Sequence, residues 1–238
     1  MGAVKGKRVP RAVREQQMMD AAVATFARRG YRAASMDEIA ELAGVSKPLV
    51  YLYLNSKEEL FSAVIRRESA ALVEAVTAAV EPDVAADRQL WSGLKGFFAH
   101  TAEHPDGWAV LHQQARTQGE PFVREVAVMR AEIADFVTGL ISAAAQEAGC
   151  DGELAEREVA SLAHALVGAA ESLAEWANVS PDTDTDGAGE RERPSAQETA
   201  ATLMNFAWAG LGRLMGGERW APGGPGPDGE PGADAAAS

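Results

Sequence analysis

The sequence predicts an all-α protein in two parts, a small three-helix head at the N-terminus and a larger helical body. Hydrophobic residues make up 47% of the 238 residues but aromatic residues only 6%, a composition typical of helices rich in Ala and Leu rather than of sheets. Apolar residues recur at helical spacing along most of the chain, and no stretch alternates apolar and polar residues between turn signals.

The sequence also indicates the cellular compartment of the protein. No apolar run reaches the roughly 18 residues that span a bilayer, and the N-terminus lacks the apolar core of a signal peptide. The single cysteine, Cys150, allows neither an intramolecular disulfide nor a multi-cysteine metal site. We therefore expect a cytoplasmic protein that does not contact a membrane.

The first helix of the head is expected at residues 11–29. Gly30 follows it and supplies the stop. We expect this helix to brace the next two helices into a three-helix unit. Its apolar residues at helical spacing are Met18, Ala22, Ala24, Phe26 and Ala27.

A turn separates two short predicted helices within residues 35–61. Ser35, followed three residues later by Glu38, forms a capping box, in which both side chains satisfy backbone donors at a helix start. A helix therefore begins near Met36, and Gly44 follows where a residue able to adopt positive φ would end it. The apolar stripe of this helix consists of Ile39, Ala40 and Ala43.

The second of these short helices has an unusual outer surface. Ser46 can cap it, and Pro48 in its first turn loses no needed hydrogen bond. Val50 and Leu54 face inward, with Tyr53 on their flank. The outer side carries a cation, an aromatic hydroxyl and two leucines, which suit phosphates and base edges in a DNA major groove better than bulk water. These outer residues are Lys47, Pro48, Leu49, Tyr51 and Leu52.

The next helix, which follows the three helices of the head, is expected to begin at a second capping box, Ser56 with Glu59, and to run to Pro82. Lys57 then lies at a helix N-terminus, where its ammonium and the nearby backbone donors can together hold a phosphate. The helix is longer than a three-helix head requires. We therefore expect it to connect the head to the body and to transmit displacement between them.

The head carries a family resemblance, which rests on Gly44-Val45-Ser46-Lys47-Pro48, Val50-Tyr51, Tyr53 and Ser56-Lys57-Glu58-Glu59-Leu60-Phe61. These runs resemble the helix-turn-helix signature of the TetR family of bacterial transcription regulators. The resemblance implies that the second motif helix enters the major groove and that Tyr31 is a core residue. The sequence departs from the common family pattern at Leu52, Tyr53 and Leu54, which leaves the operator sequence open. The DNA contacts that the resemblance and the motif give are Ser35, Met36, Ser46, Lys47, Pro48, Leu49, Tyr51, Leu52, Tyr53 and Lys57.

Charge is segregated along the chain. The net charge is −13, yet residues 1–32 carry +6 and the remainder −19. A basic head on an acidic body favours orientation on DNA by the local field. Residues 1–9 are expected to form a disordered basic arm that settles on phosphates or in a minor groove. The alternative is a solubilising tail followed by an ordinary solvated helix face.

The body is expected to consist of helices separated by Pro- and Gly-containing turns. Residues 180–194 contain no apolar residue apart from one Ala and are expected to form a flexible loop. The Gly- and Pro-rich residues 216–238 are expected to form a disordered tail. The expected body helices beyond Pro82 cover residues 84–102, 105–118, 121–148, 153–178 and 196–215. The expected domains are an arm at 1–9, a DNA-binding head at 10–56, an effector-binding and dimerisation body at 57–215 and a tail at 216–238.

The last two helices carry small and apolar residues on more than one face. A helix that is apolar over most of its circumference has to be covered on two sides, and one of these sides favours a partner. The family resemblance implies a homodimer formed by these helices, and a helix-turn-helix that reads a palindromic operator favours a dimer independently. The alternative is that the two helices lie at the centre of a monomer.

Polar groups interrupt body helices that are otherwise apolar enough for burial. Such an environment, with aromatic side chains, is typical of a small-molecule pocket, although apolar residues at helical spacing are more often ordinary core. The resemblance implies an effector whose identity is unknown. The candidate ligand-binding residues are Trp91, Phe98, Trp108, His112, Arg116, Phe136, His164 and Glu171.

Other functions have weaker support in the sequence. His100 and His104 could place two imidazoles on one helix face, but a metal site would need a third ligand, and His104 abuts the helix-ending Pro105, so capping or surface roles are favoured. No known catalytic or cofactor-binding motif is present, and we expect no cofactor and no catalytic residues. The leading hypothesis is a dimeric repressor released from DNA by a ligand. The alternatives are a constitutive DNA-binding protein without an effector and a helical enzyme.

Overall fold

The computed structural model describes residues 10–53, 55–147, 149, 156–178 and 194–215, and every regular element in these ranges is helical. The all-α prediction is therefore confirmed. Outside the described residues lie the predicted arm, the loop at 180–194 apart from Pro194, the tail, Cys150, and Leu54, which was expected to face inward.

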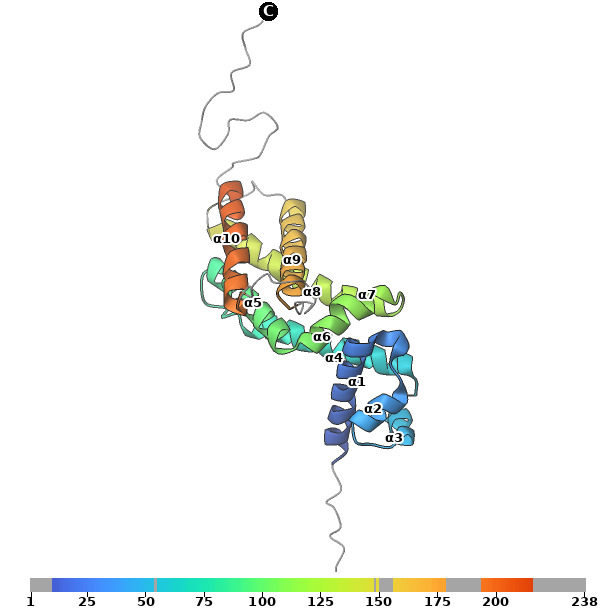
Figure 1. Cartoon of the computed structure of the whole chain (residues 1–238). Coiled ribbons are helices and arrows are strands. Elements are labelled where there is room, and N and C mark those ends of the chain that lie inside the picture. Colours follow the sequence, from blue (N-terminus) through green and yellow to red (C-terminus); the bar gives the residue numbers. More distant parts are fainter. Residues whose placement is uncertain (1–9, 54, 148, 150–155, 179–193, 216–238) are drawn as a thin grey trace, which may run out of the picture.

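The head is built from three helices and the start of a fourth (Figure 1). These are α1 (Arg11–Ala33), α2 (Met36–Leu42), α3 (Lys47–Tyr53) and α4 (Lys57–Ala78). Gly30 interrupts α1 with φ 74° and ψ 161°, and one further turn follows it, so the predicted stop is confirmed. The fully buried centre of the head consists of Met18, Phe26, Ile39, Val50, Leu60 and Phe61.

Both predicted helix starts are confirmed, but each capping box is only half formed. The Ser35 hydroxyl accepts a hydrogen bond from Glu38 N at 3.1 Å, and the Ser56 hydroxyl accepts one from Glu59 N at 3.1 Å. The Glu38 carboxylate does not return to its cap residue and accepts instead from two arginines of α1. It thereby ties the start of α2 to the end of α1. These arginines are Arg28, at 3.0 Å, and Arg29, at 3.3 Å.

Helix α4 belongs to both parts of the molecule, as the sequence predicts. Leu60 and Phe61 are buried with the head, and Leu72 and Val76 are buried where α4 packs on α5 (Ala86–Glu103) and α8 (Phe122–Glu147). One continuous helix therefore connects the body to the head.

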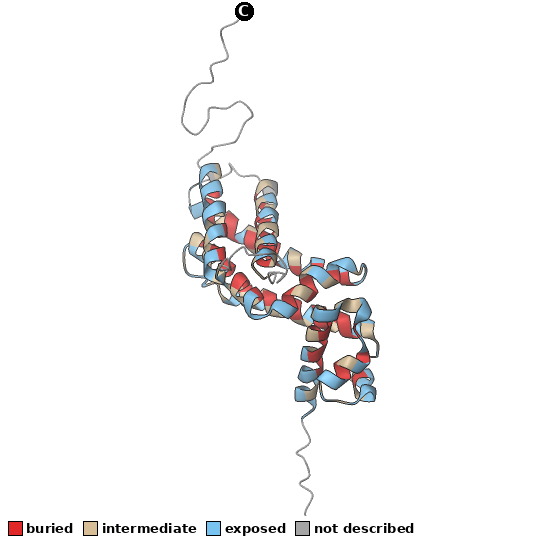
Figure 2. Cartoon of the chain, in the orientation of Figure 1, coloured by how far each residue is buried: buried red, intermediate tan, exposed pale blue. Residues whose placement is uncertain are grey.

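The body also contains α6 (Pro105–Ala109), the π-helical turn η1 (Val110–Gln114), α7 (Ala115–Thr117), α9 (Glu156–Asn178) and α10 (Ala196–Met215). The single helix predicted over residues 105–118 is thus divided by η1. In Figure 1, α9 and α10 lie side by side at the end of the body farthest from the head. Buried residues line the inner faces of the elements, and exposed residues cover α3 and the outer side of α10 (Figure 2).

The body also touches the head directly. Helix α6 and η1 pack against α1, and the Gln114 side chain reaches Gly30, where a Cβ would lie 3.0 Å from the Gln114 Oε1. Across the residues that the structure describes, no helix is long and apolar enough to cross a membrane.

Candidate functional site

The outer face of α3 presents the side chains that the sequence predicts. Val50 is fully buried and fixes the inner side of the helix. On the opposite side Tyr51 is 41% and Leu52 76% exposed. A large apolar side chain held this far into solvent on a short, anchored helix suits a surface that is covered only when a partner binds.

The flanks of α3 are partly fixed by contacts within the head. Leu49 and Tyr53 are half-buried, and the Arg11 guanidinium lies 5.0 Å from the centre of the Tyr53 ring. Cations lie over aromatic faces at this distance. Contact from Tyr53 to DNA would therefore use the edge of its ring and its hydroxyl. The remaining exposed residues of the predicted contact set are Ser35, Ser46, Lys47 and Pro48.

The Lys47 ammonium already has an internal partner. It lies 2.8 Å from one carboxylate oxygen of Asp37 and donates to the other at 2.9 Å. The hydrogen bond to Asp37 raises the pKa of Lys47 above its ordinary value. Lys47 is therefore charged and positioned, but a DNA phosphate would have to compete with Asp37 for it.

Lys57 ties the head together. Its ammonium donates to the Arg32 carbonyl at 3.2 Å and to the Ala34 carbonyl at 3.1 Å, and it lies 4.8 Å from the centre of the Tyr31 ring. Two of its three N–H donors thus hold the end of α1 against the start of α4. A phosphate could use the third. Tyr31 itself is half-buried, and its ring packs against the core with its centre 4.8 Å from that of the Phe61 ring.

Met36 requires a correction. Its side chain was expected on the DNA surface, but it is only 6% exposed and belongs to the hydrophobic core. The reason is the phase of α2, in which Met36, Ile39 and Ala40 share the buried face.

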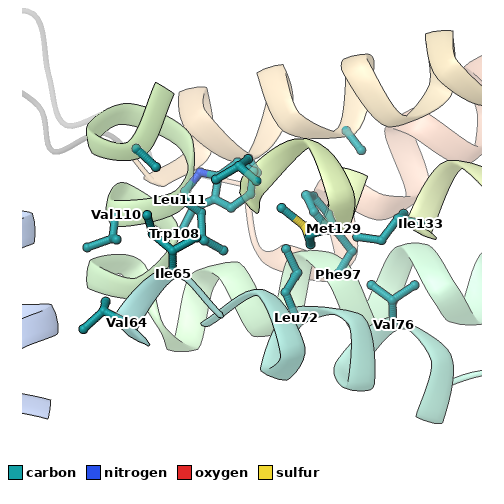
Figure 3. Packing of buried hydrophobic residues seen from close by; sticks show 14 of the residues in the cluster. Val64, Ile65, Leu72, Val76, Phe97, Trp108, Val110, Leu111, Met129 and Ile133 are labelled. Atoms are coloured by element: carbon teal, nitrogen blue, oxygen red, sulfur yellow. The ribbon is translucent and has the colours of Figure 1, made fainter. Parts of the chain in front are cut away.

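A cavity of about 40 Å³ lies in the body between α4, α5, α6, α8 and α9. Figure 3 shows Leu72 and Val76 of α4 directed toward Phe97 and Met129. Among the predicted ligand residues, Trp108, Phe136 and Glu171 line this cavity.

The polar groups of the cavity gather at one end. Arg130 Nε donates to a Glu171 carboxylate oxygen at 2.5 Å. The same carboxylate lies 3.9 Å from Arg116, whose guanidinium is 3.2 Å from His112 Nε2. The His112 ring stacks on Trp108 with 4.9 Å between ring centres. His112 and Arg116 therefore contact the lining residues Trp108 and Glu171 but do not line the cavity themselves.

Burial lowers the pKa of His112, although Glu175, 3.6 Å away, acts in the opposite direction. The ring is therefore uncharged at neutral pH. The remaining charged groups of this cluster are two cations, Arg116 and Arg130, and two carboxylates, Glu171 and Glu175.

Three predicted ligand residues lie elsewhere. Trp91 is half-buried with the Lys95 ammonium 5.6 Å from its ring centre, and Phe98 lines a separate crevice beside Asn178. His164 is exposed, and its Nδ1 lies 2.9 Å from the Ala160 carbonyl oxygen. These three residues lie outside the cavity because of their positions around or along their helices. Trp91 and Phe98 are rotated by about 100° from the cavity-lining Leu90 and Phe97, and His164 lies roughly 10 Å along α9 from Glu171.

Arg130 is the charged cavity residue that the sequence analysis missed. The one signal in the sequence is its position directly after Met129 and three residues before Ile133 on an apolar helix. An arginine inside such a stripe indicates a charge that needs a buried partner.

The outer side of α9 and α10 carries a second feature, an open apolar groove of about 560 Å³. Phe206 lines it and is 78% exposed, and Trp176 of α9 is 64% exposed. At Gly210, which also lines the groove, an added Cβ would meet nothing within 4 Å. One chain therefore leaves this face of α9 and α10 uncovered.

His100 and His104 lie with their ring centres 4.6 Å apart. No group of three His, Cys, Asp or Glu residues in the described part of the chain could hold a metal ion.

Comparisons with known proteins match both parts of the chain. A family profile described as bacterial regulatory proteins, tetR family, matches residues 18–64, and a Tetracyclin repressor-like, C-terminal domain profile matches residues 86–210. The HTH-type transcriptional activator FasR of Mycolicibacterium smegmatis is 31% identical over 213 residues, which cover 90% of each protein. The HTH-type transcriptional repressor SCO4008 of Streptomyces coelicolor is 33% identical over 126 residues, which cover 48% of this chain and 62% of that protein.

Solved structures agree with the fold. A TetR-like transcriptional regulator from Rhodococcus sp. RHA1 has a TM-score of 0.69 and 36% identity, and the match covers 86% of this chain and 99% of that one. The regulator FadR from Bacillus subtilis in complex with stearoyl-CoA has a TM-score of 0.63 and 17% identity, and the match covers 86% of this chain and 100% of that one.

Proposed function

The chain belongs to the TetR family of helix-turn-helix transcriptional regulators, and we propose that it acts as a homodimer that leaves a palindromic operator when a small molecule occupies the body. Members of this family are DNA-binding regulators rather than enzymes. Release from DNA lifts repression wherever the operator overlaps a promoter, so we propose that the protein is a repressor. The two named relatives include one activator and one repressor, so the position of the operator is the deciding feature.

One observation carries the DNA-binding proposal. Leu52 and Tyr51 stand exposed on α3 beside Lys47, on a helix anchored from below by the fully buried Val50. We expect Tyr51→Ala to weaken operator binding by about 1 to 3 kcal/mol per half-site while the dimer stays folded. Gel-shift titration at fixed salt with an operator selected from random DNA measures this. Unchanged affinity would remove α3 from the interface.

The proposed dimer uses the uncovered face of α9 and α10. Phe206 and Trp176 would be covered by the second copy, and the space above Gly210 would admit its helices closely. Two heads held in this way can read half-sites about 34 Å apart.

The size of the cavity indicates how an effector would act. About 40 Å³ admits only a few water-sized groups, so a larger ligand has to displace the walls. One wall is formed by Leu72 and Val76 of α4, the helix that continues into the head. Occupation would therefore move the two heads away from the spacing that fits DNA.

We further propose that the effector is a long apolar chain carrying an acyl group. The almost wholly apolar cavity lining with one polar end supports this class, and a neighbour of the same fold is named as a complex with stearoyl-CoA. A coupling of about 1 to 3 kcal/mol would lower operator affinity by roughly 5- to 150-fold, and DNA must weaken ligand binding by the same factor. Calorimetry with dodecanoyl-CoA, with and without operator, tests this reciprocity. Equal affinities would favour the constitutive DNA-binding alternative.

A further inference from the structure

We infer that the polar end of the cavity recognises an uncharged carbonyl oxygen on the effector, with the Trp108 indole as its donor and Arg130 beside it. The inference rests on the proposed acyl effector and adds to it the recognised atom, its charge and the recognising side chains.

The Trp108 indole N–H is a buried donor without an internal partner. The side chain is 7% exposed, and no acceptor for Nε1 occurs among the described residues. A buried indole N–H normally has a hydrogen-bond partner. Since Trp108 lines the cavity, a bound molecule with an acceptor oxygen can provide one.

Packing holds the Trp108 ring in place. Phe97 meets it at an interplanar angle of 87° with 5.6 Å between ring centres, and His112 stacks on it at 18°. A side chain fixed between two rings can discriminate between ligands because it loses little further freedom when one binds.

Arg130 supplies further donors at the same end. Its Nε is bonded to Glu171, and a guanidinium has four other N–H groups. The side chain lines the cavity beside Glu171, so a carbonyl at Trp108 would have a second donor group near it.

Charge at this end selects against a free carboxylate. Arg116 and Arg130 are balanced by Glu171 and Glu175, and His112 is uncharged. With no positive charge in excess, a buried carboxylate would be placed next to existing carboxylates without compensation. The site therefore favours a thioester or ester carbonyl over the free acid.

The position of Trp108 also links recognition to the head. Trp108 lies in α6, directly before η1, and these two elements pack on α1. A carbonyl drawn to Trp108 acts on the body segment that touches the DNA-binding head.

The test compares probes that differ only in the carbonyl or in the charge. Calorimetry with the full-length wild-type protein uses dodecanoyl-CoA against S-dodecyl-CoA, whose thioether lacks the carbonyl, and methyl dodecanoate against dodecanoate. We expect the thioester to bind about 10-fold more tightly than the thioether, and the ester to bind more tightly than the acid.

Trp108→Phe should bring the ratio of thioester to thioether affinity to about 1. The ratio is the readout because both probes experience the same change in cavity packing. Trp91→Phe is the matched control, because it removes an indole outside the cavity, and it should keep the wild-type preference. The wild-type comparison decides even if Trp108→Phe fails to fold. Equal binding of thioester and thioether would overturn the inference and leave the effector class standing. Absence of binding by all four probes would overturn both.

Discussion

In the head, most of the groups expected to meet DNA lie on the open surface of α3, whereas in the body three of the eight groups expected to meet an effector line a cavity of about 40 Å³ formed by five elements. The α3 surface is already formed in the absence of DNA, and its cation, Lys47, forms an ion pair with Asp37. In the proposed mechanism, the cavity admits an effector only after its walls have moved. A change in the head should therefore act locally, while a change in the body should act at a distance through α4.

The largest expected effect tests action at a distance. Gly210→Leu places a bulky side chain where one chain alone leaves open space, so the monomer should fold. In the proposed dimer the leucine overpacks the interface formed by α9 and α10, at a cost of about 1 to 3 kcal/mol. Because the dimer is symmetric, this cost occurs twice. Sedimentation should show monomers, and operator binding should be lost with the DNA-contacting residues unchanged. An intact dimer would assign the interface to another face.

Ala169→Leu extends the same test to α9, since Ala169 lines the same groove. The control is Gly139→Leu on α8, which is equally open in the single chain but lies outside the groove. It should remain dimeric.

The next effect tests whether the head is independent of the body. Gly30→Ala forces alanine into φ 74° and ψ 161°, a region almost restricted to glycine, at a cost of about 1 to 3 kcal/mol. It also brings Cβ to 3.0 Å from Gln114 Oε1 of the body. Gly44→Ala is the control, with φ 65° and no neighbour within 4 Å.

Urea unfolding should rank Gly30→Ala as the more destabilising of the two. Adding Gln114→Ala should recover part of the loss for Gly30→Ala and none for Gly44→Ala. Equal recovery in both backgrounds would show that the contact between Gln114 and the head carries no strain.

A smaller effect concerns the ion pair on the DNA surface. Asp37→Asn frees Lys47 for a phosphate, and since exposed ion pairs contribute roughly 0.2 to 1 kcal/mol, operator affinity should rise a few-fold. Binding should also become more steeply dependent on salt, because one more phosphate contact releases one more counterion. Glu41→Gln is the control: it removes the same charge from an exposed position of α2. Equal gains in the two variants would mean that net charge alone matters.

The smallest effect is a pH dependence of the body. Burial lowers the pKa of the folded His112, so the unfolded chain binds this proton more readily. The contribution of His112 to stability is therefore present above the unfolded value of about 6.5 and is lost as pH falls through the lower folded value. His112→Gln should show a smaller decline in unfolding free energy between neutral pH and about pH 5. Parallel curves for the two proteins would contradict this.

Features that depend on a few neighbouring residues could be predicted from the amino-acid sequence alone. Ser35, Ser56 and Gly30 marked helix ends because the hydrogen bonds and dihedral angles that end a helix are made within one turn. The buried Val50 and the exposed Leu52 followed from helical periodicity alone.

Features that depend on how helices pack against one another could not be predicted in this way. Met36 is buried, and Lys57 donates to carbonyls at the end of α1. The π-helical turn η1 interrupts the helix predicted over residues 105–118. Arg130 lines the cavity, whereas His164 does not. A cavity is the space left between several helices, and its lining depends on the rotation and sliding of each against the others. Those parameters are set by long-range packing, which the periodicity of a single helix does not specify.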